Sequence, residues 1–149
     1  MHYLDTSALV KLVVREPESA ALKKWVDAND DRLVSSDLAR TELLRAVRRA
    51  APEHAVTARA VLDAVDLLAL TTADFEAAAH LDPDIVRSLD ALHLATALRL
   101  GDELESMVTY DVRLADAARY HGVAVTAPGS PSRPRTNPAR TGPAGARRT

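Results

Sequence analysis

The sequence predicts an α/β fold, in which helices cover both faces of a short central, mainly parallel sheet of four to five strands. Two observations lead to this prediction. Apolar runs of strand length recur along the chain, and longer segments with helical periodicity separate them. Strands that alternate with helices are typical of a parallel sheet that is buried on both faces. The strand-length runs cover residues 2–4, 33–35, 68–71, 106–110 and 123–126.

Prolines and capping residues predict the helices of the first half. Pro17 suits the first turn of a helix, where the backbone donor that proline lacks would be unpaired in any case. Ser36 or Asp37 can cap the second helix, and Pro52 separates it from the third. The helices predicted in this way cover residues 17–28, 36–50 and 53–68.

The second half contains three more helical segments with clear ends. The first stops before Pro83, the second can be capped by Ser88 and ends at Gly101, and the third ends at Gly122. These helices are predicted over residues 73–81, 88–101 and 112–120.

Length and composition predict one folded domain followed by a basic tail. A chain of 149 residues, of which 47% are hydrophobic, fits a single domain with its own core. Residues 128–149 hold five of the eight prolines, three of the five glycines, five arginines and no acid. We therefore expect residues 1–127 to form the domain and residues 128–149 to be disordered.

Composition also excludes several classes of function. The chain has no cysteine, which excludes a disulfide scaffold, a thiolate zinc site and a cysteine nucleophile. No apolar run reaches the roughly 18 residues that a membrane span needs, and no secretory signal is evident, so we expect a cytoplasmic protein. Residues 1–127 carry 14 basic and 21 acidic residues, and aromatic residues make up 3% of the chain. This composition argues against a general nucleic-acid-binding surface.

Four carboxylates occur at positions that suggest one site. Asp5 and Asp111 each follow a predicted strand, and the ligands of parallel sheets collect beyond the carboxyl ends of the strands. Glu42 lies inside a predicted helix, a full turn past its cap, and Asp90 lies in the first turn of another helix. The four acids could therefore face one crevice.

Each carboxylate also has a structural interpretation. Asp5 and Asp111 could each cap a following helix. Glu42 could lie on a solvated helix face and pair with an arginine one or two turns further on. Asp90 could interact favourably with the dipole at its helix N-terminus.

If the four carboxylates converge, they need a counter-charge. Two unit charges about 5 Å apart repel each other by roughly 3 kcal/mol at an effective dielectric constant near 20. Repulsion among four such charges would exceed what a marginally stable domain tolerates, so protons or divalent cations would have to neutralise them. Oxygen ligands without thiolates favour Mg²⁺ or Mn²⁺. Such a pocket suits phosphodiester hydrolysis, and the cation would let an acidic protein hold RNA.

At these residues the sequence resembles a known family. The segments LDTSALVKL, TELLRA, LDALHLATAL and VTYDVRLADAA, in this order, resemble the PIN domain. More narrowly, they resemble the small VapC-type toxins of bacterial toxin–antitoxin pairs. The resemblance covers residues 2–127 and implies a PIN-like three-layer α/β/α fold with metal-dependent endoribonuclease activity.

The resemblance assigns roles to particular residues. By resemblance, the catalytic acids would bind one or two Mg²⁺ or Mn²⁺ ions and position the water that attacks a phosphodiester. The family also uses a hydroxyl just after the first acid, which Thr6 or Ser7 could supply. The acids of the family pattern match Asp5, Glu42, Asp90 and Asp111.

The resemblance also implies partners. It implies cleavage of structured RNA such as tRNA or rRNA, a homodimer, and inhibition by a cognate VapB-type antitoxin in a heterotetramer or a larger complex. Operator DNA would be bound only through the antitoxin. Two alternatives keep the same fold: a housekeeping RNA-processing nuclease, and a catalytically silent interaction module.

Two further interpretations concern single residues. A phosphatase of the haloacid dehalogenase type would use Asp5 as its nucleophile, but it needs a second aspartate where Ser7 stands. His93 follows Asp90 by three residues and could be a metal ligand, although we expect a buried structural histidine.

Overall fold

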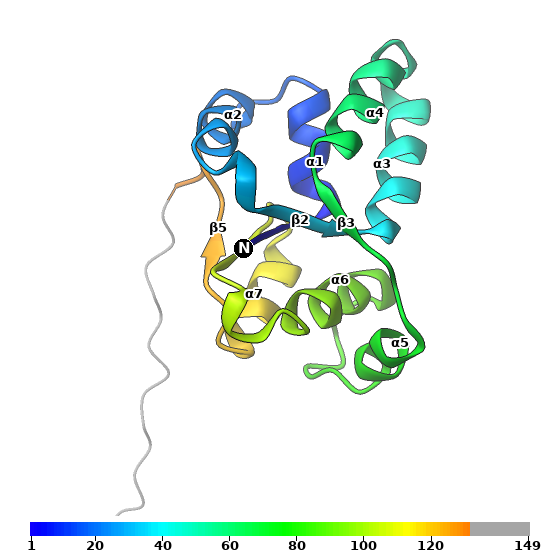
Figure 1. Ribbon diagram of the computed structural model, residues 1–149, viewed down its shortest axis with the longest axis vertical. Coiled ribbons are helices and arrows are strands. Elements are labelled where there is room, and N and C mark those ends of the chain that lie inside the picture. The colour runs from blue at the N-terminus through cyan, green and yellow to red at the C-terminus, as the bar shows by residue number, and fades with distance from the viewer. Residues whose placement is uncertain (132–149) are drawn as a thin grey trace, which may run out of the picture.

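The computed structural model describes residues 1–131, which form a three-layer α/β/α fold (Figure 1). Within these residues, five strands form one sheet in the order β3-β2-β1-β4-β5, and all four neighbouring pairs are parallel. The register places Tyr3 of the central strand between Val34 and Met107. The strands are β1 (His2–Leu4), β2 (Leu33–Ser36), β3 (Asp66–Leu68), β4 (Ser106–Val108) and β5 (Val125–Thr126).

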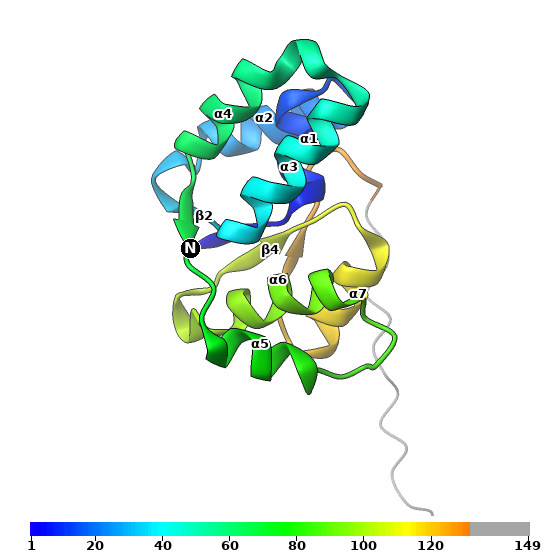
Figure 2. The ribbon, with the colours of Figure 1, turned by 90° about the vertical axis from the view of Figure 1, so that its right-hand side faces the viewer.

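Helices cover both faces of the sheet and bury two separate hydrophobic clusters. Four helices, α1 to α4, lie on one face, and α5 to α7 lie on the other (Figures 1 and 2). Side chains of a strand alternate between the faces, so Leu4 packs with Leu9 and Leu43, whereas Tyr3 packs with Leu94. The helices are α1 (Thr6–Val13), α2 (Ser19–Asp27), α3 (Asp37–Ala50), α4 (Ala55–Asp63), α5 (Thr72–Ala79), α6 (Ser88–Leu98) and α7 (Val112–Tyr120).

Helix α1 is not among the helices predicted from the sequence. Only Asp5 separates the end of β1 from the start of α1, so no loop marks the helix start. The side chain of Asp5 replaces that loop, because it accepts a hydrogen bond from the backbone N–H of Ala8 at 3.0 Å and caps the helix. Strand, cap and helix form one rigid unit that holds Asp5 at the carboxyl edge of the sheet.

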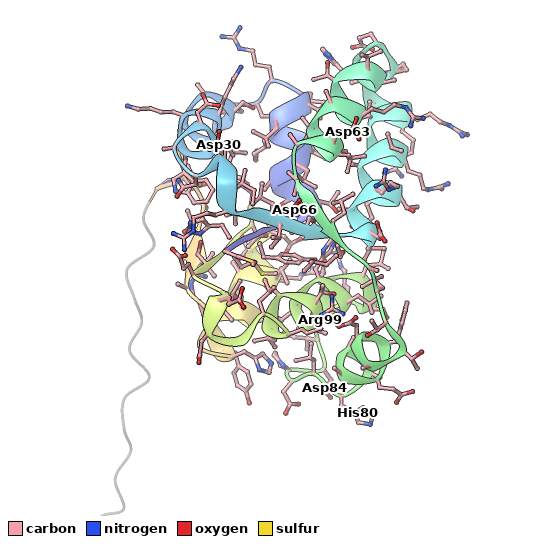
Figure 3. All side chains as sticks on the ribbon, in the orientation of Figure 1. Asp30, Asp63, Asp66, His80, Asp84 and Arg99 are labelled. Carbon is pink, nitrogen blue, oxygen red and sulfur yellow. The ribbon has the colours of Figure 1, made fainter. Side chains whose placement is uncertain are left out.

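The third strand begins two residues earlier than predicted. Thr71, which the prediction placed in the strand, is the N-cap of α5. It forms a capping box with Asp74, whose carboxylate accepts from the Thr71 N–H at 2.7 Å. Arg99, the C-cap residue of α6, pairs with the same carboxylate and joins α5 to α6 (Figure 3).

The helix predicted over residues 53–68 is also too long. A short 3₁₀ helix at Pro52–His54 precedes α4, which ends at Asp63, and Asp66–Leu68 is strand β3. After β5, the Tyr110 hydroxyl donates to the carbonyl of Pro128 at 2.8 Å, which places residue 128 against the folded domain. The remainder of the predicted disordered tail, residues 132–149, lies outside the described residues. No helix within residues 1–131 is long and apolar enough to cross a membrane.

Candidate active site

Asp5 lies at the carboxyl end of the central strand, and three hydrogen bonds hold its side chain. Its Oδ1 accepts from the Ser7 hydroxyl at 2.7 Å and from Ala8 N–H, and its Oδ2 accepts from the Thr109 hydroxyl at 2.8 Å. Burial raises the pKa of Asp5, although these hydrogen bonds favour its charged form. The carboxylate is therefore fixed in one orientation, at the edge where ligands of parallel sheets bind.

Thr109 and Ser7 connect Asp5 to the segment that carries Asp111. The Thr109 hydroxyl donates to Asp5 and accepts from Asp111 N–H at 3.1 Å. The Ser7 hydroxyl also donates to Asp5, and it accepts from Tyr110 N–H at 2.8 Å. The ends of β1 and β4 therefore belong to one hydrogen-bonded edge.

Asp111 caps helix α7, as one of the two interpretations predicts. Its Oδ1 accepts from the N–H groups of Arg113 and Leu114, at 2.8 and 3.1 Å. Because Oδ1 makes both of these bonds, capping orients the carboxylate without using Oδ2. A capping role and a role in a site are therefore compatible.

Asp90, in the first turn of α6, has a buried oxygen without a hydrogen-bond partner. Among residues 1–131, its Oδ2 is the buried side-chain atom that no donor satisfies. Burial raises the pKa of Asp90, and the negative charges of Asp111 and, more weakly, Asp5 raise it further. Asp90 therefore lies close enough to Asp111 and Asp5 to be repelled by both.

Glu42 of α3 belongs to a buried polar network. Its Oε2 accepts from the Thr6 hydroxyl and lies 2.7 Å from Nε2 of His93, while Nδ1 of His93 lies 2.8 Å from the Tyr3 hydroxyl. With a neutral ring, Nε2 donates to the carboxylate and Tyr3 donates to Nδ1. Burial alone would raise the pKa of Glu42, but the hydrogen bonds from His93 and Thr6 lower it.

The predicted site residues thus fall into two adjacent groups. Asp90 interacts through its charge with Asp5 and with Asp111, and Glu42 is held separately by Thr6, the residue next to Asp5. The suggested ion pair between Glu42 and an arginine is wrong, because its carboxylate pairs with His93.

The roles of two residues, Thr109 and His93, were not predicted from the sequence. Thr109 received no role, although its place at the end of β4, two residues before Asp111, is a strand-end signal of the same kind. His93 is buried, as expected, but it also contacts Glu42 across 51 positions of sequence. Its spacing of three residues from Asp90 placed it near the site, and only the tertiary structure reveals its partner.

The carboxylates fit a divalent cation by their chemistry more than by their present arrangement. Among the side chains that the structure describes, no group of three or more aspartate, glutamate or histidine residues is arranged to hold an ion. The donor set is nevertheless the one that Mg²⁺ and Mn²⁺ prefer, since it consists of oxygen atoms. The buried Oδ2 of Asp90, beside two other carboxylates, also has no hydrogen-bond donor, although the charge of Arg87 lowers the pKa of Asp90. These residues therefore fit such an ion.

We expect the variant Asp90→Asn to be more stable than the wild-type protein at pH 7 without metal. The substitution removes one of three repelling charges, which should raise the free energy of unfolding by on the order of 1 kcal/mol. Because the folded state raises the pKa of Asp90, the wild-type protein regains this stability as the pH falls and the carboxyl is protonated.

Urea unfolding of both proteins in EDTA, between pH 7 and pH 4, measures the difference. It should shrink on acidification. A variant that is less stable at pH 7 would show that Asp90 is not under electrostatic repulsion.

The comparisons with known proteins agree on one family. Residues 2–120 match the PIN domain family. The chain is 47% identical over 126 residues to Ribonuclease VapC46 of Mycobacterium tuberculosis, a match that covers 85% of this chain and 96% of the relative. It is 41% identical over 134 residues to Ribonuclease VapC47 of the same species, covering 87% and 98% of the two chains.

Two solved structures share the fold. The first is VapC20 of M. tuberculosis, described as a sarcin–ricin loop cleaving toxin, with a TM-score of 0.65, 20% identity and coverage of 78% of this chain and 95% of that chain. The second is FitAcB of Neisseria gonorrhoeae, with a TM-score of 0.65, 18% identity and coverage of 84% and 96%.

Proposed function

Since this chain belongs to the PIN domain family, and its relatives are VapC ribonucleases, we propose that it is the toxin of a toxin–antitoxin pair. In this proposal it is an endoribonuclease that depends on Mg²⁺ or Mn²⁺ and cleaves structured RNA, such as tRNA or rRNA. The site residues are Asp5, Glu42, Asp90 and Asp111.

The observation that carries this proposal is the buried Oδ2 of Asp90, which has no hydrogen-bond donor. A buried carboxylate oxygen without a donor, next to Asp5 and Asp111, is costly in the isolated protein. Sites that hold a cation and a phosphodiester need this kind of unsatisfied negative charge. A divalent cation held by Asp5, Asp90 and Asp111 would activate water and stabilise the charge that develops on the phosphate.

Two of the site carboxylates, Asp5 and Glu42, would orient the ligands of the site. Asp5 is held by Ser7, Ala8 and Thr109, so its carboxylate needs little reorganisation when a ligand binds. Glu42 is kept ionised by hydrogen bonds from His93 and Thr6, which suits a group that accepts a hydrogen bond from the attacking water and orients it. Ser7 and Thr6 thus act through the carboxylates that they contact.

The proposal includes two protein partners, which are an antitoxin and a second copy of this chain. Two similar solved structures are a toxin–antitoxin complex from Klebsiella pneumoniae and FitAB bound to a DNA fragment, which supports an antitoxin partner for this fold. The excess of acidic over basic residues in 1–127 suits a VapB-type antitoxin that offers an arginine to the carboxylates. We expect a homodimer that assembles with this antitoxin into a heterotetramer or a larger complex and binds operator DNA only through it.

Sequencing of new RNA 5′ ends after induced expression in a bacterial host tests this function. Wild-type protein should generate ends at one or a few sites of a structured RNA, and Glu42→Gln should generate none. Glu53→Gln is the matched control, because Glu53 is an exposed acid outside the site.

The purified protein should cleave the same RNA at the same position, and EDTA should abolish this cleavage until Mn²⁺ is restored. Unchanged RNA in every strain and with the host's own RNA in vitro would leave the silent interaction module as the better description.

A further inference from the structure

Positive charge is concentrated on two neighbouring helices of an otherwise acidic domain. Residues 43–62, which span most of α3 and all but the last residue of α4, contain four arginines and one acid, Glu53. The remainder of residues 1–127 contains 10 basic and 20 acidic residues. This segment therefore carries a local excess of positive charge. We call it the arginine face, and it consists of Arg45, Arg48, Arg49 and Arg59.

The arginines of this face are exposed and free to bind an anion. Arg40, one turn earlier on α3, pairs with Asp37. The four arginines of the face, in contrast, have no ion-pair partner within the part of the chain that the structure describes. Glu53, the acid within residues 43–62, lies next to His54, and among residues 1–131 the flanking acids Glu42 and Asp63 form no ion pair with these arginines. Four unpaired guanidinium groups on two packed helices are a suitable surface for a row of phosphates.

The arginine face begins beside the candidate active site. Arg45 follows Glu42 by three residues on α3, and Arg48 and Arg49 follow by six and seven. At 1.5 Å per residue, these positions lie roughly 4 to 11 Å further along the helix axis. The arginines therefore extend away from Glu42 in one direction, toward the end of α3 that lies far from the sheet (Figure 2).

Arg59 joins this row from the neighbouring helix. Arg48 and Arg59 line one shallow cavity between α3 and α4, together with Leu44, Val47, Pro52 and Ala55. Apolar surface of this kind can hold the methylene stems of arginine while the guanidinium groups stay in water. The cavity thus keeps two of the four charges close together.

We propose that the arginine face binds the backbone of the substrate RNA on one side of the scissile phosphodiester. This inference rests on the proposed ribonuclease function and adds the direction in which the substrate crosses the protein. An acidic domain needs a positive region to hold a long polyanion outside its cation site, and this region starts one helical turn from Glu42. Contacts to phosphates position the RNA without reading its sequence.

An acidic segment of a protein partner is the alternative ligand of this face. The position of the arginines favours RNA, because Arg45 and Arg49 follow the site carboxylate of Glu42 on α3 at spacings of three and seven residues, which place them on the same side of the helix. The two ligands predict different results for the same variant, so the test separates them.

The test compares two triple variants in which the same amount of charge is removed. The first is Arg48→Gln with Arg49→Gln and Arg59→Gln, which leaves Arg45, the arginine nearest to Glu42, in place. The control is Arg15→Gln with Lys23→Gln and Lys24→Gln, three exposed cations in α2 and in the segment before it. Helix α2 lies on the other side of α1 from α3 and α4 (Figure 1). Both sets are made in the Asp5→Asn background for binding and in the active protein for kinetics.

Binding of fluorescently labelled bulk tRNA is measured across a series of KCl concentrations. The arginine-face variant should bind at least about 10-fold more weakly at low salt, and the slope of log K against log[KCl] should lose about two units. In the active protein, the KM for RNA should rise while kcat and the cleavage position stay unchanged.

Three outcomes would overturn the inference while the proposed function stands. The first is an arginine-face variant whose affinity for RNA and salt slope equal those of the protein with all its arginines. Another is an equal loss of binding in the control variant, which would show an effect of net charge alone. The last is a loss of antitoxin affinity with RNA binding intact, which would assign the face to a protein partner. If the protein without these substitutions neither binds nor cleaves RNA, the proposed function itself fails.

Discussion

Replacing Asp5 by asparagine is expected to lower the rate of RNA cleavage at least about 100-fold, which corresponds to roughly 2.7 kcal/mol of lost transition-state stabilisation. Asp5 is the most buried of the four site carboxylates, and its orientation is fixed by three donors. The substitution removes the negative charge from the middle of the carboxyl edge. It should therefore weaken both cation binding and the alignment of the phosphodiester.

The same substitution should leave the fold intact. The amide oxygen of asparagine can still accept from Ala8 N–H and cap α1. The hydroxyl groups of Ser7 and Thr109 can rotate, so one of them can accept from the new amide group instead of donating to a carboxylate. Circular dichroism and a cooperative thermal transition close to that of the wild-type protein would check this.

Asp66→Asn is the matched control for Asp5→Asn. Asp66 is exposed and begins β3, so it lies at the amino edge of the parallel sheet, opposite the edge that carries Asp5 (Figure 3). Its replacement removes the same charge from the same domain and should leave the cleavage rate within about twofold of the wild type. If Asp5→Asn cleaved RNA as fast as this control, Asp5 would have no role in catalysis.

The fold could be predicted from the sequence because its signals are local. Short apolar runs and capping residues located all five strands to within a few residues, and the helices between them followed from periodicity. Helix α1 was not predicted, and the reason is physical. A single residue, Asp5, forms the whole connection between β1 and α1 and also caps the helix. The loop that usually separates a strand from a helix is absent there.

The candidate site could be predicted only in part. Asp5 and Asp111 were recognisable from their positions after strands, because parallel strands bring their carboxyl ends to one edge. The electrostatic coupling of Asp90 to these two acids depends on the packing of α6 against the sheet. The pairing of Glu42 with His93 likewise joins α3 and α6 across the sheet edge, and no sequence spacing encodes such a contact.

Replacing His93 by leucine is expected to reduce cleavage at least about 10-fold, because hydrogen bonds to charged groups are worth about 1.5–3 kcal/mol. His93 is buried, and its Nε2 lies 2.7 Å from the Glu42 carboxylate. Without this donor, only Thr6 holds the same oxygen. Glu42 should then adopt several orientations, and its pKa should rise toward the value that burial favours.

Glutamine at position 93 should restore most of the activity that leucine removes. Its side-chain amide can reach the place of Nε2 and donate to Glu42, whereas leucine of similar size cannot donate at all. Tyr3→Phe removes only the hydroxyl that lies 2.8 Å from Nδ1, so its effect should be smaller, about threefold. The order of rates should therefore be wild type, then Tyr3→Phe and His93→Gln, then His93→Leu.

Thr96→Val separates this positioning effect from a general loss of stability. Thr96 is fully buried one turn further along α6, and its hydroxyl donates to the carbonyl of Leu92 at 2.7 Å, away from Glu42. Its replacement should cost about 1 kcal/mol of stability and leave kcat unchanged. His93→Leu should instead lower kcat and weaken Mn²⁺ binding, measured by calorimetry, at temperatures where it is fully folded. Equal kcat values for His93→Leu and His93→Gln would show that the donor at Nε2 does not position Glu42, and that His93 acts only as a core residue.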